Sequence, residues 1–544
     1  MKVDEDFVMD RRIDFETDDE ENLAERVCDA DGSDDDTDSD TMVPSRTASN
    51  VGGDNPTWPQ SYRQSIDMYT TSTPPTFSFL TGSSLTRITS SFGPAQRRPG
   101  AAAAPGSPLN EPLICDSAIE EGEGMPASYL PVYCSATSKL PSLSTFELPQ
   151  PEQKCSYAQS LLNAVNVLCG IGLLSTPYAF REGGWWSLAI LFVFAIITCY
   201  TGLLLKRCLE SSPHLQTFPD IGQAAFGVPG RVCLSIILYV ELYSSCVEYL
   251  IMMGDNLSAL FPNTHMAFAG TYLDSSQICK IISFLVILPT VWLRNLTLLS
   301  YISVGGVVTA LLVSFCLLWV GVVDKVGFHP SGTALDLAKL PVTVGIFGFC
   351  YGSHSVFPNI YSSMEEPSKF PSVLLISFVT SGLLYAGVGV CGFLMFGNST
   401  KSQFTLNMPP EFVATKIAAW TTVVAPLTKY ALTITPVAFS LEELLPSARF
   451  RSYSVSMLIR TILVFSTLIV ALSFPYFGSV MAFIGSLLVM LVALVFPCAC
   501  YLSICRDRVT KLQISACILT IMVGLISAIV GTYSSITNIA DESG

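Results

Sequence analysis

The stretch from Asn166 to Phe180, NVLCGIGLLSTPYAF, puts polar and helix-breaking residues inside the first long apolar segment of the chain. Gly170 and Gly172 stand two positions apart, and Asn166 precedes the first of them by about one helical turn. Glycine lets the backbone turn and lets a ligand approach it closely. A helix that unwinds in mid-membrane frees amide N–H groups, which suit a carboxylate, and carbonyl groups, which suit an ammonium group or a cation. A zwitterion needs both.

A second interruption, FGFCYGSH from Phe347 to His354, occurs five apolar segments later and is followed by Pro358. Two broken segments in corresponding positions predict two inverted five-helix repeats with a binding site near the middle of the bilayer, as in secondary transporters. The alternative is that the glycines only permit close packing of neighbouring helices. His354 is a candidate for a pH-sensing or substrate-binding role, and the alternative is a buried structural histidine.

Ionisable side chains also occur within the apolar segments, where they are costly and usually functional or paired. Glu241, Glu248 and Asp255 are seven residues apart, nearly two helical turns, and therefore share one stripe. A carboxylate at this depth is disfavoured as the anion, which suits a carrier of protons; a structural partnership is the alternative. Lys429, in the apolar segment 412–440, is the natural partner, and a fixed ion pair with Glu248 that only aligns helices is the simpler explanation.

Eleven long apolar segments must position these groups. The chain has 544 residues, a mean hydropathy of +0.49 and only 13% charged residues, whereas soluble proteins carry about 25%. Most segments reach the roughly 20 residues that a hydrocarbon core of about 30 Å requires, and backbone in lipid must satisfy its own hydrogen bonds as helix. We therefore predict an all-α integral membrane domain over residues 156–540, with helices at about 157–180, 184–205, 233–260, 278–293, 296–323, 340–361, 371–396, 412–440, 454–474, 476–501 and 511–537.

Residues 1–155 have a different composition, rich in Asp, Ser, Thr, Pro and Gly, and are predicted to be a disordered cytosolic tail. The first forty residues hold 18 acidic and 4 basic side chains, which accounts for nearly all of the net charge of −15. Ser33, Thr37 and Ser39 lie among aspartates and are candidate phosphorylation sites. The alternative is a solvated spacer, and the protein partners of this tail are unknown.

Basic residues are more frequent in loops that are cytosolic if the N-terminus is cytosolic, which with eleven helices puts the C-terminus on the other side. The glycosylation acceptor Asn398 then falls in a non-cytosolic loop, whereas Asn295 falls on the cytosolic side and is expected to be unused. Seventeen cysteines are scattered through apolar runs, without the spacing of a metal site, and are expected to act as small packing residues.

Three blocks of sequence resemble the amino acid/auxin permease family, part of the amino acid-polyamine-organocation superfamily. The pattern N-x-x-x-G-x-G-x-L-S-x-P-Y-A-F resembles its first helix, residues 218–231 resemble its cytosolic loop after the second helix, and residues 351–367 resemble its sixth helix and exit. The resemblance covers about residues 157–538. The acidic tail is similar to that of the plant vacuolar amino-acid transporter branch, which is related to vesicular inhibitory amino-acid transporters.

The resemblance implies a LeuT-like fold, a 5+5 inverted repeat plus one C-terminal helix, that moves neutral amino acids coupled to protons. At matching positions, Asn166, Gly170 and Gly172 would contact the substrate's amino and carboxylate groups, together with backbone near Tyr351 and Gly352. Ile171 stands where several family members have serine, so that recognition depends more on the backbone.

Lys429 acquires a second interpretation from this resemblance. In LeuT-like folds the eighth helix lies against the broken first helix, where sodium-coupled relatives bind a sodium ion. We hypothesise that the Lys429 ammonium takes the place of that ion, and that its protonation is the coupling event.

We therefore expect a proton/amino-acid antiporter of the vacuolar membrane, driven by a proton gradient without a cofactor. A plasma-membrane amino-acid or auxin permease is one alternative, and an amino-acid sensor that signals through its tail is another. An enzyme is not expected, because the sequence shows no activated Ser or Cys motif, no metal-ligand spacing and no phosphate-binding loop. No nucleic-acid partner is expected.

Overall fold

The computed structural model describes residues 154–268, 271–292, 305–329, 332–445 and 453–543. The predicted tail up to residue 153, with Ser33, Thr37 and Ser39, and the sequon at Asn295 therefore lie outside the described residues. The described part is helical apart from one hairpin, β1 (Met266–Phe268) and β2 (Thr271–Leu273), whose strands pair antiparallel with Met266 opposite Leu273. This hairpin lies in a connection between two helices, and together with an isolated bridge between Cys155 and Met364 it departs from the predicted all-α class.

The helices follow the apolar segments of the sequence. Their bounds are α2 (Tyr157–Leu168), α3 (Thr176–Gly183), α4 (Ser187–Leu209), α5 (Phe218–Leu260), α6 (Ser275–Trp292), α8 (Gly305–Val322), α9 (Leu340–Cys350), α10 (Phe357–Ser363), α11 (Phe370–Phe396), α12 (Val413–Glu443), α13 (Tyr453–Ser473), α14 (Phe477–Ile484), α15 (Phe496–Ile504) and α16 (Lys511–Ser543). Within the described residues, nine helices are long and apolar enough to cross a membrane, with α14 and α15 joined by π-helical turns into one, and the bent pair α2–α3 makes a tenth.

The first helix breaks where the glycines stand. α2 begins with a capping box, because the Ser156 hydroxyl accepts the Gln159 N–H while the Gln159 side chain accepts the Ser156 N–H. It ends at Leu168, and a 3₁₀ turn over Ile171–Ser175 leads into α3, whose first turn contains a proline. The axes before and after the break differ by 44°.

α5 is longer than the sequence predicts. It begins at Phe218, after the capping box of Thr217, whereas the apolar run begins at 233. Residues before 233 are too polar for a spanning segment, yet they form helix that bends at Gly227, where φ is +69°. Across the bend Arg231 pairs with Asp220 at 2.9 Å. The bend separates a short polar helix from the spanning part.

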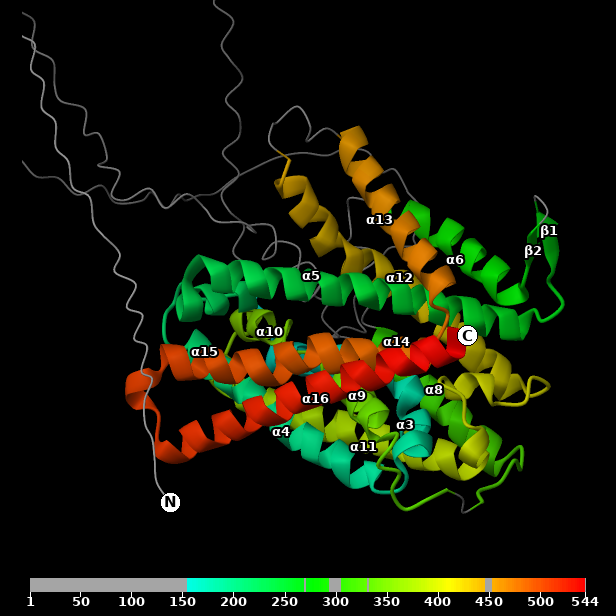
Figure 1. The fold of residues 1–544 in the computed structure, drawn as a ribbon, viewed down its shortest axis with the longest axis horizontal. Helices are drawn as coiled ribbons and strands as arrows, with labels where there is room; N and C mark the ends of the chain where they lie inside the picture. The colour runs from blue at the N-terminus through cyan, green and yellow to red at the C-terminus, as the bar shows by residue number, and fades with distance from the viewer. Residues whose placement is uncertain (1–153, 269–270, 293–304, 330–331, 446–452, 544) are drawn as a thin grey trace, which may run out of the picture. The chain divides into compact units, whose positions relative to one another are not determined.

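The helices form one packed bundle with an apolar exterior. α6, α12 and α13 pack together against α5, while α11 packs against α2 and α3, and α16 runs beside α14 and α15 (Figure 1). Large apolar side chains cover the outer face of α16, where Leu512 is 81% and Tyr533 is 72% exposed. Surfaces of this kind are unstable in water but match a bilayer. The chain is a multi-pass membrane protein.

Candidate functional site

Both helix breaks line one cavity. The first break, between α2 and α3, contributes Gly170, Ile171 and Gly172, and the second, between α9 and α10, contributes Gly352 and neighbouring residues. The remaining walls come from α5, α11, α12 and the π-helical turn after α14, namely Glu241, Leu242, Ser245, Tyr249, Tyr385, Leu432, Thr433, Pro436 and Val489. The structure thus brings two breaks that lie far apart in the sequence to the same cavity.

The two glycines of the first break serve different purposes. A methyl group built on Gly172 would lie 2.7 Å from the Cys350 Sγ and 3.2 Å from the Cys350 Cα, so this glycine permits the two breaks to touch. A methyl group on Gly170 would meet nothing closer than the Val167 carbonyl at 3.8 Å. The φ of Gly170 is −84°, which any residue adopts. The backbone conformation therefore does not require a glycine at position 170. The absence of a side chain there instead leaves space in the cavity that it lines.

At the second break, several backbone groups already have partners. The Tyr351 N–H donates to the Phe347 and Gly348 carbonyls, and the Gly352 N–H donates to the Phe349 carbonyl at 3.2 Å. The Tyr351 ring is fully buried and stacks on Phe378 with centroids 5.7 Å apart. Gly352 lines the cavity, whereas Tyr351, the residue that follows α9, does not line it.

Tyr385, which the sequence analysis did not single out, connects the two breaks. It lies in the middle of α11, and its hydroxyl is within hydrogen-bond distance of the Leu168 carbonyl and, at 3.1 Å, of the Cys350 carbonyl. These carbonyls end α2 and α9, the first halves of the broken helices. One signal was available: a tyrosine hydroxyl inside a long apolar segment needs a polar partner.

The acidic stripe of α5 meets three different environments. Glu241 lines the cavity. Glu248 is fully buried, and neither of its carboxylate oxygens has a hydrogen-bond partner among the described residues. Asp255 lies 3.7 Å from the Lys280 ammonium and accepts hydrogen bonds from Ser276 and Gln403, both at 3.1 Å. Only the first of the three shares a space with the helix breaks.

Lys429 lies at a second, smaller cavity. This cavity is lined at the first break by Cys169, Gly170, Ile171, Leu173 and Leu174. Its other walls come from α5, α8 and α12, including Tyr249, Gly306, Thr309, Thr421 and Thr422. Gly170, Ile171 and Tyr249 line both cavities. Lys429 forms no ion pair within 4.0 Å in the described ranges, so its predicted alternative role as the partner of Glu248 has no contact to support it.

Asn166 packs against Gly306 of α8, which lines the second cavity, and does not line the first. A methyl group built on Gly306 of α8 would lie 2.0 Å from the Asn166 Oδ1 and 3.2 Å from the Lys429 Cε. The absence of a side chain at Gly306 therefore leaves room for both the amide and the lysine stem beside α8. Asn166 does not appear among the residues that line the first cavity, where the sequence analysis expected it to contact substrate.

His354 is fully buried between the second break and α4. Its Nε2 lies 3.1 Å from the Thr198 carbonyl and 2.9 Å from the Thr201 hydroxyl, and its ring packs 5.0 Å from that of Phe357. Because the carbonyl only accepts, Nε2 carries the hydrogen. The histidine lines neither cavity and holds the second break against α4.

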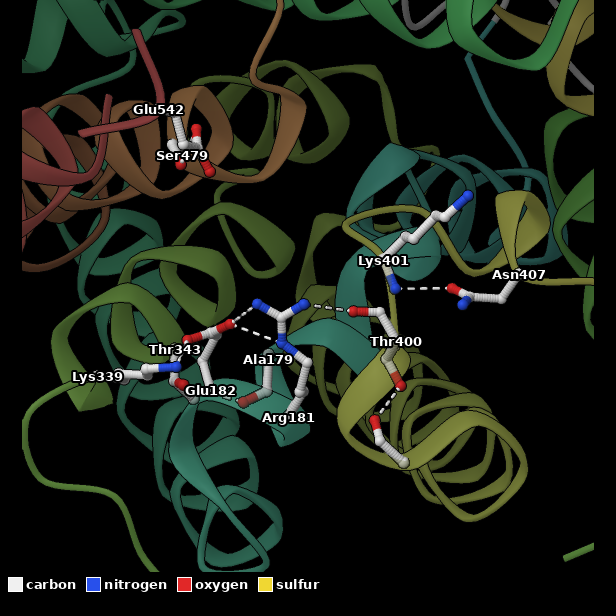
Figure 2. A network of polar contacts seen from close by, with 11 residues as sticks. Ala179, Arg181, Glu182, Lys339, Thr343, Thr400, Lys401, Asn407, Ser479 and Glu542 are labelled. Atoms are coloured by element: carbon white, nitrogen blue, oxygen red, sulfur yellow. Dashed lines mark hydrogen bonds and ion pairs between the residues drawn. The ribbon is translucent and has the colours of Figure 1, made fainter. Parts of the chain in front are cut away.

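A polar network ties α3 to the segments around it (Figure 2). The Arg181 guanidinium donates to the Glu182 carboxylate and, at 2.7 Å, to the Thr400 carbonyl, while Lys339 lies 3.4 Å from the same carboxylate. Asn398, the predicted glycosylation acceptor, is exposed in the 3₁₀ turn Gly397–Ser399 just before Thr400. The network joins α3, the start of α9 and the connection after α11.

Comparison with known proteins identifies the class. Residues 153–537 match the model of a family described as "Transmembrane amino acid transporter protein", and the chain belongs to this family. The match confirms the transporter family that the three sequence blocks resemble, and it is a family of transporters rather than enzymes.

Several Arabidopsis thaliana proteins are similar over most of their length. The chain is 55% identical to amino acid transporter AVT1D, over 90% of this chain and 88% of that protein. It is 52% identical to amino acid transporter AVT1E over all of both chains. It is 48% identical to amino acid transporter AVT1C over 98% of each.

Proposed function

We propose that this chain exchanges protons for neutral amino acids across the vacuolar membrane by alternating access. The observation that carries the proposal is that two helix breaks and one carboxylate, Glu241, line the same cavity. The printed names of the relatives, all amino acid transporters, support the substrate class.

The cavity suits an amino acid with an uncharged side chain. The Ile171 and Gly172 N–H groups, in the first turn of the 3₁₀ helix at the first break, are offered to the substrate's carboxylate, and carbonyl groups near Gly170 and Gly352 are offered to its ammonium. Most of the remaining wall is apolar, namely Leu242, Val356, Leu432, Pro436 and Val489. An apolar wall favours an apolar side chain because burial removes its surface from water. Ile171, in place of a hydroxyl-bearing residue, adds to this wall.

We assign proton coupling to Glu241 and Lys429, the carboxyl group that lines the first cavity and the amine that lines the second. A proton on Glu241 would remove the charge next to the substrate, and the Lys429 ammonium would occupy the space between α12 and the first break. Glu248, Asp255 and His354 are weaker candidates, because Asp255 and His354 already have fixed partners and none of the three lines a cavity.

The proposed architecture has eleven spanning helices, counting the α2–α3 and α9–α10 pairs as one span each, over residues 156–540. The spans form two inverted repeats of five plus α16, with residues 1–155 as a cytosolic tail and the C-terminus in the lumen. The exposed position of Asn398 supports its use as a glycosylation site. A glycosidase-sensitive mass shift that Asn398→Gln removes would establish the side of this loop, and a shift that persists would argue against the topology.

Flux measurements test the function directly. Purified protein in proteoliposomes with an acidic interior should accumulate labelled neutral amino acids, and collapsing the gradient should stop accumulation. Accumulation only when the exterior is acidic would indicate symport, as expected of a plasma-membrane permease. Binding without flux would favour a sensor, and transport of auxin but not of amino acids would overturn the substrate class.

A further inference from the structure

We infer that Tyr385 is a positioning residue for the substrate's ammonium group. The inference rests on the proposed function, because it concerns how the cavity between the breaks holds an amino acid. Tyr385, Leu168 and Cys350 all line this cavity. The tyrosine is fully buried.

The two carbonyls beside the hydroxyl owe their availability to the breaks. In continuous helices the Leu168 and Cys350 carbonyls would accept N–H groups four residues later. Instead, the Leu168 carbonyl accepts the Gly170 N–H at 2.7 Å, and for the Cys350 carbonyl the Tyr385 hydroxyl is the one donor within the described residues. The hydroxyl therefore links the C-terminal ends of two half-helices, where the helix dipoles place partial negative charge.

A tyrosine hydroxyl has one hydrogen to donate. It lies within reach of two carbonyls, so at any moment one of the two lacks this donor. That carbonyl can accept an N–H from an ammonium group in the cavity. The Tyr385 hydroxyl lies within reach of both carbonyls, so it spaces the two half-helix ends even when only one of them accepts its hydrogen. The result is a preformed acceptor site for an ammonium group, which a carboxylate or an uncharged apolar molecule would not satisfy.

Tyr430 offers a matched control. It lies in α12, is equally buried, and has its hydroxyl 2.6 Å from the Thr467 hydroxyl, but it lines neither cavity. Tyr430→Phe therefore removes a buried tyrosine hydroxyl and its hydrogen bond without removing a link between the breaks. Tyr385→Phe keeps the ring and loses only the link.

The experiment compares the two variants and the wild type in proteoliposome uptake. Tyr385→Phe should raise KM for a transported amino acid about tenfold, which corresponds to about 1.4 kcal/mol, with a smaller change in maximal rate. Tyr430→Phe should leave KM unchanged. Competition by the matching carboxylic acid without an amino group should be the same in all three proteins, because that molecule makes no ammonium contact.

Two results would overturn the inference. One is an unchanged KM in Tyr385→Phe. The other is an equal loss of affinity for the amino acid and for the deaminated competitor, which would mark a general loosening of the site. Elution profile and melting temperature in detergent separate misfolding from weaker binding, and ligand-induced stabilisation then reports affinity without transport. If the wild type itself moves no amino acid, the proposed function fails and not the role of Tyr385.

Discussion

Gly172 in the first helix break lies against Cys350 in the second, so closely that a methyl group would come within 2.7 Å of the Cys350 Sγ. The contact sets the separation of the two breaks, and with it the width of the cavity between them. A side chain here cannot be accommodated by a flexible neighbour alone, because the Cys350 Cα would also lie only 3.2 Å away.

Gly172→Ala should therefore destabilise the protein by about 1–3 kcal/mol, as overpacking typically does, and should abolish or strongly reduce transport. Gly170→Ala provides the control, because its methyl group would meet no protein atom closer than 3.8 Å. That variant should melt like the wild type but raise KM, since the methyl group enters the cavity. Melting curves and uptake kinetics check both. Equal behaviour of the two alanine variants would contradict this division of roles.

Glu241→Gln preserves the shape of the cavity-lining side chain but cannot take up or release a proton. We expect uptake driven by a pH gradient to be lost, while exchange of labelled for unlabelled substrate continues. Glu248→Gln, whose carboxyl lines neither cavity, should retain gradient-driven uptake. If Glu241→Gln instead retains gradient-driven uptake and Glu248→Gln loses it in the same proteoliposomes, the coupling role belongs to Glu248.

Lys429→Met removes the ammonium from the second cavity and keeps most of the side-chain volume. Proton-coupled uptake should disappear and some substrate exchange should remain. Lys416→Met, on the same helix but exposed, should have little effect on either activity. Full gradient-driven uptake by Lys429→Met would remove the proposed coupling role.

The Asp255–Lys280 pair is expected to contribute to stability rather than to transport. Lys280 is 1% exposed, so Asp255→Asn leaves an ammonium buried without its counter-charge. Breaking such a pair commonly costs about 3–5 kcal/mol, and the melting temperature should fall accordingly. The double variant Asp255→Asn/Lys280→Met should recover most of the loss. If the loss of stability in the double variant equals the sum of the losses in Asp255→Asn and Lys280→Met, the ion pair is not the source of the stabilisation.

In the network of Figure 2, Glu182 should contribute more to the stability of α3 than Lys339 does. Glu182→Gln weakens the attachment of Arg181, whose other partner is the Thr400 carbonyl. Hydrogen exchange in α3 should then become faster. Lys339→Met should change little, because that lysine side chain is 56% exposed and exposed ion pairs contribute about 0–1 kcal/mol. A larger effect at Lys339 than at Glu182 would reverse this ranking.

The position of the breaks could be predicted from sequence, because glycines and a proline in an apolar run are local signals. Which polar residues face which cavity could not. Glu241, Glu248 and Asp255 share a helix face, but each interval of seven residues rises about 10 Å along the axis. The three carboxyl groups therefore lie in different environments: Glu241 at a cavity, Glu248 in the core and Asp255 in an ion pair with Lys280. The partners depend on neighbouring helices, which a single helix period does not specify.

Asn166 and Tyr385 also show that contacts between helices cannot be read from sequence spacing. The family pattern implies that Asn166 contacts the substrate, but its side chain packs against Gly306 and does not line the first cavity. Tyr385 carries no local pattern at all, and its role follows from two carbonyls in other helices. Contacts of this kind arise from the tertiary arrangement, not from sequence spacing.

Gly170, Ile171 and Tyr249 form a wall common to both cavities. Whatever occupies one space must share this wall with whatever occupies the other. Thermodynamic linkage then makes the effect reciprocal: if protonation at Lys429 changes the affinity for substrate by some factor, bound substrate changes proton affinity by the same factor. These three shared residues would be enough to couple substrate binding in the first cavity to protonation in the second.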